Sequence, residues 1–142
     1  MAANIYPFYP QYAANSAPAW VTLTTANTAM DGTGTVTTLF TAASADGHFI
    51  PYLIVRPLGT NVASVIRVFI NNGADPTVAT NNALITEIGT FATTASNTTP
   101  QNGIIHSMPP GFILPSGYKI NLTLGTAVAA GLKVIAIQGA FS

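Results

Sequence analysis

The residues that could carry acid–base or metal chemistry are few, and they are spread along the whole chain. His48 and His106 stand far apart, and neither is accompanied by a second imidazole or by the further ligands that a metal site needs. Paired carboxylates for glycoside hydrolysis must lie within several ångströms of each other. Here the four carboxylates fall in four different segments: Asp31, Asp46, Asp75 and Glu87. The spacing favours neither a metal site nor an acid–base pair.

Motifs for nucleophilic or phosphate chemistry are also missing. The chain has no cysteine, no Gly-x-Ser-x-Gly elbow, and no glycine-rich loop followed by lysine. Asp31-Gly-Thr-Gly34 is glycine-rich but offers one carboxylate, which indicates a turn and not a calcium loop. We therefore expect no enzymatic activity, no catalytic residues, no metal and no cofactor.

Charge is scarce, which bears on possible partners. Only 6% of the 142 residues are charged: four are basic (Lys or Arg) and four are acidic (Asp or Glu). Four basic residues are too few to neutralise a phosphate backbone, so we expect no nucleic-acid partner. No apolar run reaches the length of a membrane span and the start of the chain lacks a basic region, so we expect neither a membrane anchor nor a signal peptide. A neutral surface gives weak colloidal repulsion. Two interpretations remain: an ordinary β-rich surface, or a surface partly covered in an assembly.

Short runs of β-branched and aromatic residues with a period of two indicate strands from Trp20 onward. The spacing of the runs, separated by Gly, Pro, Asn and Asp turns, favours an all-β fold. We predict a single β-sandwich domain over residues 21–142, jelly-roll-like with about eight strands. The expected strands are residues 20–25, 34–42, 48–58, 63–71, 83–93, 103–108, 118–125 and 132–138.

Two stretches of the chain align with each other without a gap: residues 58–68 and 124–134. Both begin Leu-Gly-Thr and both place a basic residue, Arg67 or Lys133, one position before the final valine. The pattern predicts two related hairpins with these cations facing outward, and chance similarity of two ordinary hairpins is the alternative.

Residues 1–20 differ in composition from the rest. Proline at positions 7, 10 and 18 excludes helix and favours extended backbone. Ordering residues 1–12 costs about 18 kcal/mol and burying four aromatic side chains returns roughly 20 kcal/mol, so a neighbouring surface would decide the balance. We predict an extended assembly arm, against the alternative of a loose or self-packed terminus. Its partner-binding residues are Ile5, Tyr6, Phe8, Tyr9, Tyr12 and Trp20.

Aromatic residues of the sandwich offer a different possibility. Tyr52, Phe112 and Tyr118 could stack on sugar rings if they formed an exposed platform. Packing inside the sandwich is the ordinary role of such residues, and it is the alternative.

Four blocks, in this order along the chain, resemble a family of small proteins from tailed bacteriophages and prophages. They are TTANTAMDGTGTV at residues 24–36, RVFINNG at 67–73, NNALITEI at 81–88 and LPSGYKINLTLGTAVAAGLKV at 114–134. The resemblance spans about residues 24–139, and the segment before Trp20 has no counterpart in it. The family is associated with the virion and offers no catalytic residues to carry over.

The resemblance implies a virion structural protein, most simply a capsid decoration (cement) protein that binds the outer shell and bridges capsomers. Its expected partners are the major capsid protein and further copies of itself, with a homotrimer favoured. Its expected location is the capsid surface after synthesis in the host cytoplasm. A tail or fibre component and a module that binds host-surface carbohydrate are the alternatives.

Overall fold

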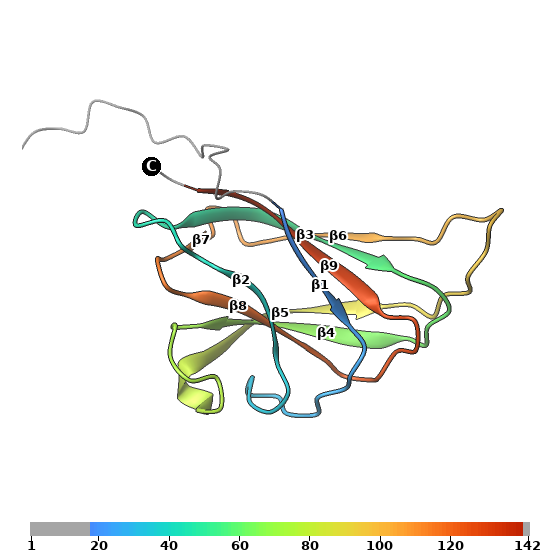
Figure 1. Cartoon of the computed structure of the whole chain (residues 1–142), viewed down its shortest axis with the longest axis horizontal. Helices are drawn as coiled ribbons and strands as arrows, with labels where there is room; N and C mark the ends of the chain where they lie inside the picture. The colour runs from blue at the N-terminus through green and yellow to red at the C-terminus, as the bar shows by residue number, and fades with distance from the viewer. Residues whose placement is uncertain (1–17, 141–142) are drawn as a thin grey trace, which may run out of the picture.

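The computed structural model describes residues 18–140, which form two antiparallel sheets packed face to face (Figure 1). Its helical content is one short 3-10 turn, Ala79–Asn81. The all-β sandwich predicted from the alternating pattern is confirmed. The strands are β1 (Ala19–Leu23), β2 (Thr37–Thr41), β3 (His48–Pro57), β4 (Ser64–Asn71), β5 (Asn82–Thr90), β6 (Ile104–Ser107), β7 (Ile113–Leu114), β8 (Lys119–Leu124) and β9 (Leu132–Ala140).

The chain distributes its strands between the two sheets in a regular way. Sheet I has the order β1-β9-β3-β6, with β7 also paired to β3, and sheet II has the order β2-β8-β4-β5. The first four strands alternate between the sheets, so most connections cross from one layer to the other. Every pairing is antiparallel, and the chain's two described ends lie in neighbouring strands of sheet I.

Each of the eight expected strands corresponds to an observed one, and the ninth strand, β7, was not expected. β7 pairs with β3 at His48 and Phe49, while β6 pairs with β3 from Tyr52 to Val55. The two short strands therefore extend one edge of sheet I, interrupted by Pro109 and Pro110, which cannot donate ladder hydrogen bonds. A two-residue strand is too short for a periodic pattern to reveal it.

The core lies between the sheets and is built from the inward members of each alternating strand. Leu53 and Val55 of β3 face Ile66 and Val68 of β4 across it, all at most 1% exposed. Burial of such side chains contributes roughly 1.5–3 kcal/mol each, which makes this layer the main source of stability. Other buried members are Leu23, Leu39, Ala42, Ile50, Ile88, Met108, Leu114, Ile120, Leu122, Leu124, Val128, Leu132, Val134 and Ala136.

The two aligned stretches are not hairpins, and that expectation was wrong. Residues 58–63 carry the chain from β3 in sheet I to β4 in sheet II, and residues 125–131 carry it from β8 in sheet II back to β9 in sheet I. Each is an arch that crosses the sandwich. The arches meet at one end of the molecule, where the Leu58 N–H donates to the Gly131 carbonyl at 3.0 Å.

Asn61 joins three loops at that end. Its side-chain oxygen accepts from the N–H groups of Ala130 and Gly131 at 2.9 and 3.1 Å, and its amide donates to the Gly131 carbonyl at 3.0 Å. Its backbone bridges to Thr93, after β5, in both directions. Because Asn61 is only 5% exposed, water cannot replace these bonds.

We predict that Asn61→Ala lowers the free energy of unfolding by about 3 kcal/mol, because two backbone N–H groups lose their acceptor in a buried position. Urea denaturation measures the change. Asn72→Ala is the matched control: Asn72 is exposed and accepts from Ala74 at 3.1 Å, and its loss should cost less than about 0.5 kcal/mol. Equal stability of the two variants would contradict the role given to Asn61.

Candidate functional site: the outer face of sheet I

Trp20 is the one predicted arm residue that lies within the described part of the chain. It belongs to β1, where it pairs with Ile135 of β9, and its indole is 61% exposed. The other five predicted partner-binding residues lie outside the described residues: Ile5, Tyr6, Phe8, Tyr9 and Tyr12. Trp20 is therefore the one predicted binding residue whose surroundings the structure describes.

Trp20 begins a row of apolar side chains that crosses all four long strands of sheet I. The registers pair Trp20 with Ile135, Ile135 with Ile54 and Ile54 with Ile105, so the four residues lie side by side. Residues directly opposite one another on neighbouring strands share a face. Their sequence neighbours face the core, so this row points outward; Ile105 is 68% exposed.

A second apolar pair lies beside this row, and cations border its other side. Ile137 pairs with Tyr52, which is 37% exposed. This pair lies two residues along β9 and β3 from the pair of Ile135 and Ile54. In the opposite direction Lys133 pairs with Arg56. The outer face of sheet I therefore carries a continuous apolar area with two basic residues at its margin. We call it the sheet I face: Trp20, Tyr52, Ile54, Ile105, Ile135 and Ile137.

Sheet II differs, because its outer face has a cover within the chain. The connection between β1 and β2, residues 24–36, passes beneath sheet II in Figure 1. Gly32, at φ +79°, lies so close that an added Cβ would be 2.9 Å from the Phe69 ring, and the Arg67 guanidinium donates to the Asn27 carbonyl at 3.4 Å. Phe69 is consequently 1% exposed although it faces away from the core between the sheets.

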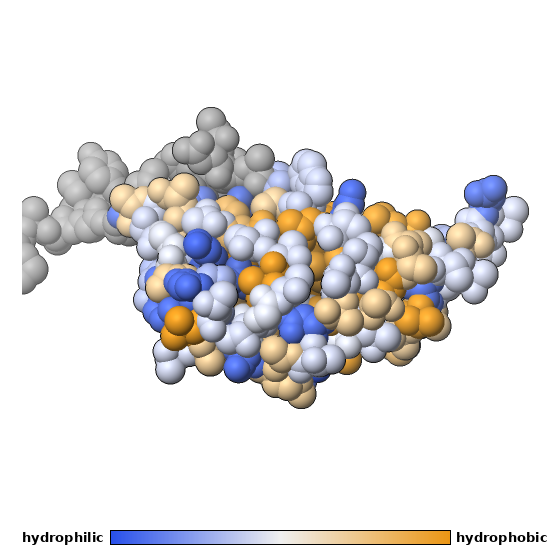
Figure 2. Space-filling model, turned by 60° about the horizontal axis from the view of Figure 1, so that its bottom comes forward, coloured by the Kyte–Doolittle hydropathy of each residue, from blue (hydrophilic) through white to orange (hydrophobic). Residues whose placement is uncertain are grey.

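The face of the molecule shown in Figure 2 is weakly polar. The side turned forward in Figure 2 mixes apolar residues with neutral polar ones, and strongly hydrophilic residues form only small islands. Large contiguous apolar areas are rare on monomeric proteins and mark interaction surfaces. On the sheet I face, Trp20, Tyr52 and Ile105 are exposed, and Ile54, Ile135 and Ile137 between them are partly exposed.

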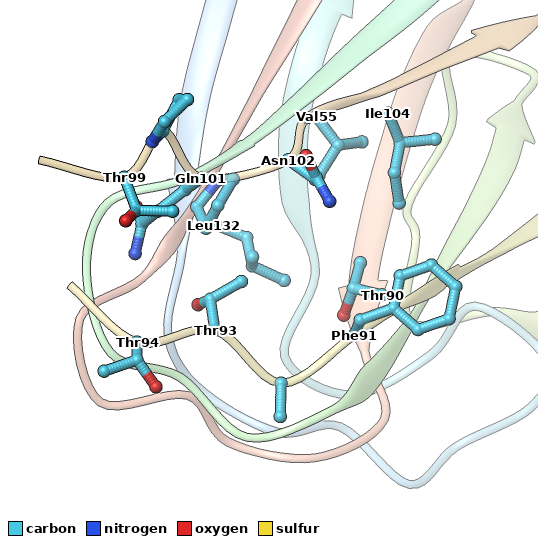
Figure 3. Close-up of a pocket in the computed structure, with 14 residues that line it drawn as sticks. Val55, Thr90, Phe91, Thr93, Thr94, Thr99, Gln101, Asn102, Ile104 and Leu132 are labelled. Atoms are coloured by element: carbon cyan, nitrogen blue, oxygen red, sulfur yellow. The ribbon is translucent and has the colours of Figure 1, made fainter. Parts of the chain in front are cut away.

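A pocket of about 290 Å³ opens beneath the long connection between β5 and β6 (Figure 3). Phe91 and Ile104 form one side of it, and Thr93, Thr99 and Gln101 lie toward the other. No lining residue has a side chain that ionises, so the pocket offers hydroxyl and amide groups for binding but no acid, base or ligand for a metal.

The titratable groups of the described residues are dispersed. His48 is fully buried: its Nε2 accepts from the N–H groups of Ala43 and Ser44 at 3.3 and 3.2 Å, and its Nδ1 lies 2.6 Å from the Gln138 side-chain oxygen. Because Nε2 accepts, the proton sits on Nδ1 and the ring orders the turn before β3. His106 contacts the Thr86 hydroxyl at 3.0 Å instead. Residues 18–140 contain no group of three potential metal ligands.

The acidic residues act locally. Glu87 accepts from Arg67 at 2.9 Å, and this is the one ion pair in the described part of the chain. Asp31 and Asp75 each close a turn: the Thr33 hydroxyl and N–H lower the pKa of Asp31 below its usual 3.8, and the Thr77 N–H and hydroxyl do the same to the pKa of Asp75. These carboxylates have structural partners and do not converge on a shared site.

The three aromatic residues considered as a sugar platform do not lie on one exposed face. Tyr52 belongs to the sheet I face, whereas Phe112 and Tyr118 are partly buried and pack against the core. Their packing is the ordinary structural role of aromatic residues in a sandwich.

Comparison with known proteins gives no further guide: no family model, no curated protein and no solved structure matches the chain. Within residues 18–140, no helix has the length and apolar character needed to cross a membrane.

A small polar cavity of about 240 Å³ lies where β1, β2 and β8 meet, lined largely by threonines. One of them, Thr123, is 2% exposed, and its hydroxyl has no hydrogen-bond partner among the described residues. The Thr90 hydroxyl, also buried, both donates to the Ser64 carbonyl and accepts from the Ser64 N–H. The two threonines differ in what their hydroxyls contribute.

We predict opposite results for the two isosteric substitutions. Thr123→Val should leave the free energy of unfolding unchanged or raise it, because it removes a buried hydroxyl with no hydrogen-bond partner among the described residues. Thr90→Val should lower it by about 1–2 kcal/mol, because two bonds to Ser64 are lost. Thermal denaturation of both variants beside the wild type gives the comparison, and a larger loss for Thr123→Val would refute the assignment.

We also predict that the Asp31 and Asp75 turns weaken in acid. A carboxylate whose folded pKa is lowered stabilises the fold above its unfolded pKa, and the contribution is lost as the pH falls through the folded value. The double variant Asp31→Asn, Asp75→Asn keeps an acceptor but no charge. The stability difference between wild type and variant, measured in urea from about pH 6 to about pH 2, should therefore shrink toward low pH. A stability difference that does not change with pH would contradict the lowered pKa values of Asp31 and Asp75.

Proposed function

We propose that the protein is a non-enzymatic virion structural component of a tailed phage: a capsid decoration (cement) protein that binds the outer shell and bridges capsomers. The observation that carries the proposal is the sheet I face, an uncharged apolar surface with no cover among the described residues. An exposed apolar surface of this kind is expected of a protein that buries it against a partner in an assembly.

The strand order supports the same proposal. If β6 and β7 are counted as one interrupted edge strand, eight strands run in the orders 1-8-3-6 and 2-7-4-5. We assign this order to the jelly roll, two Greek keys closed on each other, which recurs in viral capsid and lectin domains. The resemblance to tailed-phage proteins over residues 24–139 agrees with a virion role.

The partners that this role requires are the major capsid protein and other copies of the chain. We propose that residues 1–18, which precede β1, act as an assembly arm and that the protein forms a trimer over a symmetry axis of the shell. Many weak contacts repeated around the shell would then stabilise it through multivalency. The neutral surface of the protein favours such association.

Copy number tests the proposal. Quantitative mass spectrometry of purified particles that encode this chain should give about one copy, or about a third of a copy, for each major capsid subunit, because a decoration protein follows the symmetry of the shell. A few copies in every hundred would place the protein in the tail or fibres. Absence from the particles would overturn a structural role in the virion.

A further inference from the structure

We infer that the sheet I face binds the aromatic segment of residues 5–12 from a neighbouring copy of the chain, so that copies are joined by exchanged arms. The inference rests on the proposed assembly role and adds the surface that receives the arm. Its first support is the contrast between the sheets: residues 24–36 cover the outer face of sheet II around Arg67 and Phe69, and the sheet I face has no such cover within residues 18–140.

The chemistry of the segment matches that of the face. Residues 5–12 contain Ile5 and four aromatic residues, and no residue before Asp31 has a charged side chain. The receiving rows are isoleucines with Trp20 and Tyr52, and the cations Arg56 and Lys133 lie at their margin. Contact between the two would bury no charged side chain of the arm, which removes the main cost of forming an interface.

The arm side is large enough for a specific contact. Four aromatic side chains at about 200 Å² each bury roughly 800 Å² on the arm side. Specific protein–protein interfaces bury about 800 Å² on each partner. The arm alone is therefore large enough to hold two copies together.

Chain direction favours a neighbouring copy over the arm's own sheet. Residues 13–18 link the segment to β1 and span at most about 20 Å. Pro18 is exposed directly before β1, and proline restricts the preceding residue to extended backbone. Cover of the arm's own sheet requires a turn between residues 13 and 18, whereas exchange with a neighbouring copy requires none; cross-linking separates the two arrangements. If every copy donates one arm and receives one, the exchange closes into a ring.

Disulfide trapping tests the exchange directly, because the full chain contains no cysteine of its own. Purified Tyr9→Cys protein is mixed with Ile105→Cys protein under mild oxidation, after the oligomers have been allowed to exchange subunits. Tyr9 lies in the arm, and Ile105 is 68% exposed on the sheet I face. Met30→Cys replaces Ile105→Cys as the control, since Met30 is 66% exposed on the connection that covers sheet II.

We expect a linked heterodimer from the Tyr9→Cys and Ile105→Cys mixture, at a yield at least several-fold above that of the Met30→Cys mixture. Equal yields, or no linkage, would overturn the inference. A double variant that links only within one chain would show the arm on its own sheet, and would overturn it also. If no linked heterodimer forms but the particles contain the copy number expected for the shell, the decoration role stands and the arm exchange is wrong. If the heterodimer forms but the protein is absent from particles, the decoration role alone is wrong.

Light scattering of Ile105→Glu and Met30→Glu in the full chain gives a second measurement. Ile105→Glu places a charge in the receiving face and should reduce the oligomer to monomer, while Met30→Glu should leave its mass unchanged. Both side chains are exposed, so both variants should fold. If Ile105→Glu loses the oligomer but Tyr9→Cys does not link to Ile105→Cys, the sheet I face joins the copies but residues 5–12 do not occupy it.

Discussion

Every sheet has two faces, and a sandwich can bury only the inner face of each against the other. Sheet II solves the remaining problem within the chain: residues 24–36 fold over its outer side, Gly32 allows the close approach to Phe69, and Asn27 fixes the connection through the Leu124 carbonyl at 2.7 Å. Sheet I has no equivalent cover among the described residues, yet its outer rows are apolar. That asymmetry is the basis of the assembly role proposed for the chain.

Most of the fold could be predicted from the sequence, because strands with one buried face alternate with a period of two and end at Gly, Pro and Asn. The expected strands of residues 48–58 and 63–71 match β3 and β4 closely. What failed was the connection between them. A local pattern shows that the chain turns back, but it does not show whether the returning strand joins the same sheet or the opposite one, since that choice depends on the distant arch at Gly131.

The candidate site was predictable only in part. The aromatic side chain of Trp20, at the end of the proline-rich segment, predicts a binding role, and Trp20 lies on the exposed outer face of sheet I. Ile54, Ile105 and Ile135 were missed because each appears in its own strand as an ordinary apolar residue. Only the registers of β1, β9, β3 and β6 reveal that they align with Trp20. The one sequence signal was alternation: Ile54 stands between Leu53 and Val55, and Ile135 between Val134 and Ala136, so each points to the opposite face from its neighbours.

Trp20 is the only tryptophan of the chain, so its fluorescence tests directly whether the sheet I face is covered in the assembled protein. Emission and acrylamide quenching would be measured while the full chain is diluted through the proposed oligomer–monomer transition. Coverage predicts blue-shifted, protected emission in the oligomer and a shift to water-like, quenchable emission on dilution. Water-like emission that stays equally quenchable in the oligomer and the monomer would contradict an assembly built on this face.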